Sequence, residues 1–153
     1  DGTQAGGMIF SYSQICFLMA EAALRGMTTV GDAETWYTLG IDASMKQWGI
    51  SAADAFSYKS QATVAYDATK GLEQIGTQKW ASLYLQGAEA WSEWRRLDFP
   101  KLEPAEDALS GNGIPVRNGY AALTKSLNEE NYNAAVSSQG ADTQDTRLWW
   151  DTK

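Results

Sequence analysis

Two carboxylates in one aromatic segment are the side chains best suited to chemistry. Glu89 and Glu93 lie on either side of Trp91, and Asp98 follows shortly after them. A glycosidase needs two carboxyl groups around the scissile bond, roughly 5 Å or roughly 6.5–9.5 Å apart depending on its mechanism. Residues four apart share one face of a helix, so this pair has a suitable spacing. The same spacing is common on ion-paired helix surfaces, so we interpret the segment as structural and keep a hydrolase as the minor alternative.

The composition removes most other kinds of catalytic site. The chain has no histidine, so Ser-His-Asp and Cys-His arrangements and the commonest transition-metal sites cannot be assembled. Its single cysteine, Cys16, supports neither a disulfide within the chain nor a zinc cluster. Oxygen atoms of Asn131, Asp142 and Asp145 could be imagined around calcium, but their spacing is unlike that of an EF-hand loop. We therefore predict no catalytic residue, no metal and no cofactor.

Charge and length narrow the class of protein further. Nineteen acidic against 12 basic residues give a net charge of −7, which would repel a phosphate backbone, so nucleic-acid binding is not expected. The 153 residues, of which 44% are hydrophobic, suffice for one domain with a buried core. No run of about 18 apolar residues is present, so we predict no membrane-spanning helix.

Apolar residues recur at helical spacing along the chain, and no alternating strand pattern of useful length occurs. Ser11 or Ser13 is a candidate N-cap for a helix over 11–25, and Asp32 is one for a helix over 32–48. Because only a short turn joins them, the two helices should pack antiparallel. The predicted fold class is all-α, with tetratricopeptide-like antiparallel helix pairs and a long irregular loop.

Glycines and prolines divide the rest of the chain. Ser51 and Asp54 resemble a helix cap, Gln61–Thr69 is expected to form a moderate helix, and a longer helix from Gly71 should break or bend near Gly87. A cluster of prolines and glycines then predicts a loop without a helix longer than about two turns. The predicted parts of a single domain, 1–153, are a helix pair (11–48), further helices (61–97), the loop (98–119), a C-terminal helix (120–136) and a polar tail (137–153).

The aromatic content is high, with seven tryptophans, seven tyrosines and four phenylalanines. Large rings bury much apolar area, so most of them should form the core. The residues assigned to structural roles on apolar helix faces are Trp36, Trp48, Trp80 and Trp94. A minority could line a sugar-binding or peptide-binding surface, and such residues are more often displayed beside loops. The candidate ligand-binding residues are Trp91, whose face is ambiguous, and Phe56, Tyr58, Tyr66 and Phe99.

Glu21 is the charged residue most at odds with its surroundings. It follows Leu18, Met19 and Ala20 and precedes two alanines, so its carboxylate should lie on the core side of the first helix. A buried carboxylate needs a cationic partner. We predict that Glu21 is ion-paired with Arg95 or Arg96.

Several segments together resemble a known family. Trp36-x-x-Leu39-Gly40 is similar to the W-x-x-L-G signature of tetratricopeptide repeats. The chain further resembles the SusD/RagB family of Bacteroidetes outer-membrane nutrient-binding lipoproteins, whose motifs it matches in order over residues 9–151. The matching strings are Met19–Gly26, Trp80–Leu97, Ile114–Arg117 with Tyr120, Asn128 to Ala135, and Trp149–Asp151. Ala121 departs from the family, in which proline is frequent at that position.

This resemblance implies a function without bond cleavage. Family members are surface lipoproteins that capture an oligosaccharide and pass it to a TonB-dependent (SusC-like) outer-membrane transporter. The resemblance covers only the C-terminal part of such proteins, and the family's lipid-anchored cysteine is absent from this chain. Two alternatives stay open: a peptide-binding member of the same family, and a helical-repeat module that binds a protein partner.

Overall fold

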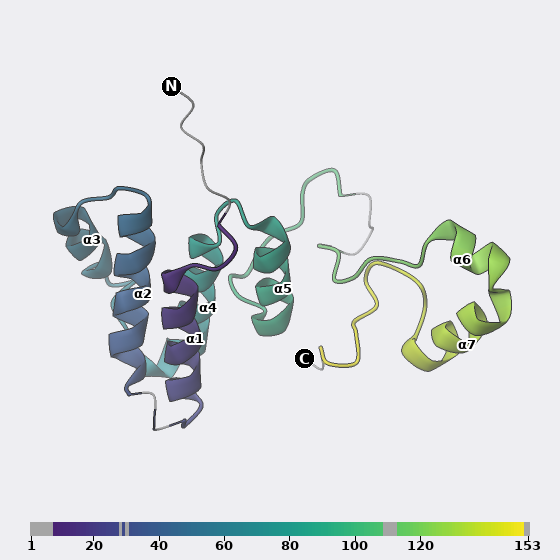
Figure 1. Cartoon of the computed structure of the whole chain (residues 1–153), viewed down its shortest axis with the longest axis horizontal. Helices are drawn as coiled ribbons and strands as arrows, with labels where there is room; N and C mark the ends of the chain where they lie inside the picture. Colours follow the sequence, from purple (N-terminus) through teal and green to yellow (C-terminus); the bar gives the residue numbers. More distant parts are fainter. Residues whose placement is uncertain (1–7, 28, 30, 109–112, 152–153) are drawn as a thin grey trace. The chain divides into compact units, whose positions relative to one another are not determined.

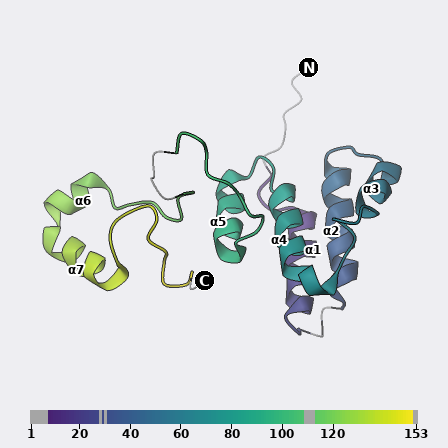
Figure 2. The ribbon, with the colours of Figure 1, turned by 180° about the vertical axis from the view of Figure 1, so that it is seen from behind.

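The computed structural model describes residues 8–27, 29, 31–108 and 113–151. In these ranges the chain contains helices and no strand, which confirms the all-α prediction (Figures 1 and 2). The helices are α1 (Tyr12–Leu24), α2 (Ala33–Gln47), α3 (Ala52–Lys59), the 3₁₀ helix η2 (Ala68–Lys70), α4 (Gly71–Ser82), α5 (Gly87–Leu97), α6 (Ala122–Leu127) and α7 (Glu129–Gln139). None of the helices in the described ranges combines the length and the apolar character needed to cross a membrane.

Helices α1 and α2 form the predicted antiparallel pair (Figure 1). Ser11 caps α1 in a capping box, accepting from the backbone N–H of Gln14 while its own N–H donates to the Gln14 side chain. Asp32 caps α2 by accepting from the backbone N–H of Thr35. Both helices begin and end within one residue of the ranges predicted from the sequence, because the caps mark their first turns.

The core of residues 1–100 lies where α1, α2 and α4 meet. It is formed by Phe17, Ala20, Tyr37, Ile41, Val64 and Ile75. The buried hydroxyl of Tyr37 donates to the carbonyl oxygen of Val64 at 2.7 Å, which ties the segment after α3 to α2. Burial raises the pKa of this phenol, so Tyr37 stays a neutral donor.

Gly40 allows α1 and α2 to approach closely. A Cβ atom at Gly40 would lie 2.8 Å from ring carbons of the fully buried Phe17. We expect Gly40→Ala to lower the free energy of unfolding by about 1–3 kcal/mol, because the added Cβ would overlap the Phe17 ring and force it out of its packed position. Chemical denaturation measures this change. Gly87→Ala is the control, since a Cβ there meets nothing within 4 Å, and equal effects of the two substitutions would contradict the close approach.

The prediction of a helix over 61–69 is wrong. The structure has turns there, followed only by the short helix η2. The side chain of Gln74 accepts from the backbone N–H of Asp67 and donates to the carbonyl oxygen of Ala65, both at 2.8 Å. These bonds to the Gln74 side chain take the place of helical backbone hydrogen bonds. The segment is therefore held against α4 and does not form a helix of its own. Helix α3, capped by Ser51, occupies the preceding residues.

The helical pattern after Gly71 breaks where the sequence predicts. Helix α4 ends at Ser82 and α5 begins at Gly87. In the intervening turn Leu85 has a positive φ of 68°, a conformation that non-glycine residues seldom adopt.

Residues 101–153 form a second compact unit. The predicted single helix over 120–136 is wrong, because Asn128 leaves helical geometry (φ −143°, ψ 50°) and separates α6 from α7. Helix α7 also runs three residues beyond the predicted end, so the irregular tail is shorter than predicted. Asp142 organises this unit by pairing with Arg117 at 3.0 Å and accepting from the Tyr120 N–H and the Tyr132 hydroxyl. The described residues of the predicted loop 98–119 contain no helix, and residues 109–112 lie outside the description.

Candidate functional site

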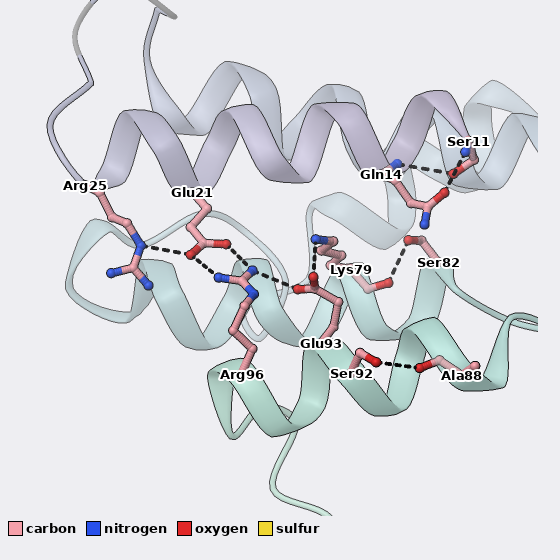
Figure 3. A network of polar contacts seen from close by, with 10 residues as sticks. All are labelled: Ser11, Gln14, Glu21, Arg25, Lys79, Ser82, Ala88, Ser92, Glu93 and Arg96. Atoms are coloured by element: carbon pink, nitrogen blue, oxygen red, sulfur yellow. Dashed lines mark hydrogen bonds and ion pairs between the residues drawn. The ribbon is translucent and has the colours of Figure 1, made fainter. Parts of the chain in front are cut away.

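A partly buried ionic network joins α1, α4 and α5 (Figure 3). Glu21, 5% exposed, projects from α1 and accepts two hydrogen bonds from Arg96 of α5, at 2.6 Å from Nη1 and 2.5 Å from Nη2. Arg25, one turn further along α1, donates from Nε to Oε1 of Glu21 at 2.8 Å. The predicted burial and arginine pairing of Glu21 are thus confirmed, with Arg96 as the partner on α5.

Glu93 extends the network to α4. Its Oε1 lies 2.9 Å from Nζ of Lys79, which is 1% exposed, and its Oε2 accepts from Nη2 of Arg96 at 2.8 Å. Glu89, one turn earlier on α5, is exposed. Because both oxygens of Glu93 are bound by cations, the geometry favours the structural interpretation of this carboxylate pair. In the described ranges no group of three or more His, Cys, Asp or Glu side chains is arranged to hold a metal ion.

The network controls the ionisation of Glu21. Burial alone raises the pKa of this carboxyl, but hydrogen bonds and charge from Arg96 and then Arg25 outweigh burial and lower the pKa to about 2. The same contact with Glu21 raises the pKa of Arg96. Glu21 and Arg96 are therefore both charged at neutral pH, and their ion pair links α1 to α5.

The five predicted ligand-binding aromatics lie in different environments. Tyr58 and Tyr66 are half-buried and pack against the core. Phe56 of α3 is 70% exposed. Trp91 lies under the guanidinium of Arg95, whose Cζ is 3.7 Å from the ring centroid, and Phe99 packs near Gly76 of α4. The structure does not bring these five side chains together in one site. Their contact with a ligand stays a prediction.

Sequence reasoning missed a different aromatic pair. Trp48, at the C-terminal end of α2, was assigned to the core, but it is 46% exposed, so that prediction is wrong. Its ring lies edge to face with the ring of Tyr84, which is 65% exposed, at a centroid distance of 5.4 Å. We call Trp48 and Tyr84 the aromatic pair. The signal available in the sequence was Gly49, which ends α2 directly after Trp48 with a φ of +74°.

Two hollows lie along α4. The smaller, about 120 Å³, lies between α2 and α4 and is lined by Phe17, Ile41, Ser44, Met45, Tyr58, Gln78, Ala81 and Ser82. The larger, about 320 Å³, is lined by Tyr37, Ala62, Thr63, Asp67, Lys70, Glu73, Gln74, Thr77 and Gln78. Gln78 lines both, and its Nε2 donates to the Tyr58 hydroxyl at 2.9 Å. Amide and hydroxyl side chains thus line both hollows beside α4, and such groups can bond polyhydroxylated ligands.

Comparison with known families gives one match that covers most of the chain. A SusD-like family model, described as "Starch-binding associating with outer membrane", matches residues 2–121. A search of curated proteins finds no match.

Solved structures agree with this family match. A structure described as "Bacteroidetes AC2a SusD-like" is 33% identical, with a TM-score of 0.86 over 96% of this chain and 31% of its own. A chitin-binding SusD homologue from Flavobacterium johnsoniae is 31% identical, with a TM-score of 0.77 over 92% of this chain and 36% of its own. A SusD homologue from Bacteroides thetaiotaomicron is 29% identical, with a TM-score of 0.82 over 92% of this chain and 38% of its own. The chain therefore spans about a third of the length of these proteins, and its helices have the predicted tetratricopeptide-like fold.

Proposed function

This chain belongs to the SusD-like family, and from that premise we propose that it is part of an outer-membrane protein that binds glycans without cleaving them. The observation that carries the proposal is the match of residues 2–121 to a family described as starch-binding. Similarity to a chitin-binding SusD homologue supports the same class of ligand. The polar hollows and the aromatic pair along α4 offer chemistry of the kind that a sugar chain needs.

The proposal extends to the protein's place in the cell. We propose that the intact protein is a lipid-anchored protein at the cell surface that passes its ligand to a TonB-dependent transporter, as the family resemblance implies. Binding without cleavage agrees with the use of Glu93 as an ion-pair partner of Lys79 and Arg96.

Titration calorimetry of the intact protein tests the glycan proposal. The panel contains starch, chitin, maltoheptaose and chitohexaose, with an unrelated peptide mixture as the arm for the alternative ligand class. We expect saturable binding of at least one glycan, with a constant sugar-chain length after prolonged incubation, as judged by chromatography. Binding of peptides alone, or of none of these ligands, would overturn the proposal, and shortening of the chain would overturn its non-catalytic part.

A further inference from the structure

The two rings of the aromatic pair are exposed on the surface of this chain, at 46% and 65%. They come from the ends of α2 and α4, which lie at the same end of the helix layer (Figures 1 and 2). The residues beside them, Ile50 and Leu85, are also exposed, at 46% and 78%. A cluster of exposed large apolar side chains on a folded unit marks a binding surface more often than single exposed residues do.

The two turns that carry the rings hold them in place. Trp48 donates its backbone N–H to the carbonyl of Met45, and Tyr84 donates its own to the carbonyl of Ala81. Met45 and Ala81 both line the smaller hollow, so the two turns that carry the rings begin beside it. The left-handed conformation of Leu85 turns the chain immediately after Tyr84. Such conformations are unfavourable for residues other than glycine and persist where surrounding contacts impose them.

Polar groups continue from the aromatic pair along α4. The smaller hollow presents Ser44, Tyr58 and Gln78, and the Tyr58–Gln78 hydrogen bond fixes two of these side chains before any ligand arrives. The larger hollow adds Thr77 and the exposed Lys70. Helix α4 has 12 residues and is thus about 18 Å long, several times the width of one sugar ring.

We propose that the aromatic pair and the two hollows along α4, together the α4 track, form a binding surface for an extended oligosaccharide. This inference rests on the proposed glycan binding and assigns residues to it. The apolar face of one sugar ring stacks on the aromatic pair, and the hydroxyls of the following sugars bond the amide of Gln78 and the hydroxyls of Ser44 and Tyr58. Because the contacts are spread along a helix, affinity should grow with the number of linked sugars.

Defined oligosaccharides and single substitutions test this assignment on the intact protein. Calorimetry with maltoheptaose and chitohexaose, and with glucose and N-acetylglucosamine, measures the dependence on chain length. We expect whichever oligosaccharide the protein binds to have an affinity at least about tenfold higher than that of its monosaccharide. We expect Trp48→Ala and Tyr84→Ala each to lower the affinity for this oligosaccharide by about tenfold or more, as for central aromatic contacts in other interfaces. Tyr84→Phe, which keeps the ring, should recover most of that loss.

Trp149→Ala is the matched control, because Trp149 is 83% exposed and lies in the second unit, outside the α4 track. It should bind like the unsubstituted protein. If the unsubstituted protein binds no glycan, the proposed function fails. If it binds but Trp48→Ala and Tyr84→Ala bind equally well, the α4 track is wrong and the proposed function stands. Should either variant misfold by circular dichroism, Gln78→Ala and the chain-length series decide, and equal affinity for monosaccharide and oligosaccharide would overturn the inference.

Discussion

Glu93→Ala should lower the free energy of unfolding by about 3–5 kcal/mol, measured by chemical denaturation at pH 7. Its partner Lys79 is 1% exposed, and the Nζ atom lies 2.9 Å from the Glu93 carboxylate. Removal of the carboxylate leaves a buried ammonium without its counter-charge, and α4 packing keeps water away from it. Arg96 also loses a carboxylate partner.

Glu89→Ala is the matched control for this prediction. It removes the same side chain from the same helix, one turn earlier, where the residue is exposed. Its cost should be about 0.5 kcal/mol or less, as for ordinary surface substitutions. Equal costs for the two variants, or a cost below about 1 kcal/mol for Glu93→Ala, would show that the Lys79–Glu93 pair is not buried in solution.

The same network bears on the α4 track. Tyr84 lies in the turn 83–86, between α4 and α5. Lys79 fixes α4 to α5 through Glu93, and Arg96 fixes α5 to α1 through Glu21 (Figure 3). The Lys79–Glu93 pair thus links the two helices on either side of the turn that carries Tyr84.

Where the sequence contains N-cap residues, they were sufficient to predict where a helix begins. Ser11 with Gln14, and Asp32, mark the starts of α1 and α2, and Glu21 is conspicuous as a carboxylate among alanines. The helix prediction for 61–69 is wrong because the structure of this segment depends on Gln74, whose side chain bonds the backbone of Asp67 and Ala65. Helical propensity in a short window carries no information about such a distant acceptor and donor.

The candidate site was harder to predict than the fold. Tyr58 and Tyr66 are predicted ligand-binding residues because binding residues are often displayed beside loops, and the structure packs both rings partly against the core. Their contact with a ligand stays a prediction. Trp48 was assigned to the core because it continues the apolar face of α2. That periodicity identifies a face, but whether another element covers its last turn depends on the packing of α4 and its following turn.

Glu21→Ala should lower the free energy of unfolding at pH 7 by about 3 kcal/mol. The pKa of Glu21 in the folded protein is about 2, against 4.5 for the ordinary carboxyl. Each unit of difference corresponds to about 1.4 kcal/mol between the two protonation states, so the shift corresponds to about 3 kcal/mol. Arg96 keeps Glu93 and its side chain is 36% exposed, so it regains some hydration and the cost stays below that of Glu93→Ala.

The pH dependence separates this charge effect from a simple loss of packing. A carboxyl whose pKa is lowered on folding contributes stability that is fully present above about pH 4.5 and is lost as the pH falls toward 2. Glu21→Gln keeps the shape of the protonated side chain. The difference in unfolding free energy between the unsubstituted protein and Glu21→Gln should therefore be largest near neutral pH and shrink toward zero at about pH 2. Denaturation curves at pH 7, 4 and 2.5 measure it, and a difference that stays constant over this range would mean that Glu21 stabilises the fold without its charge.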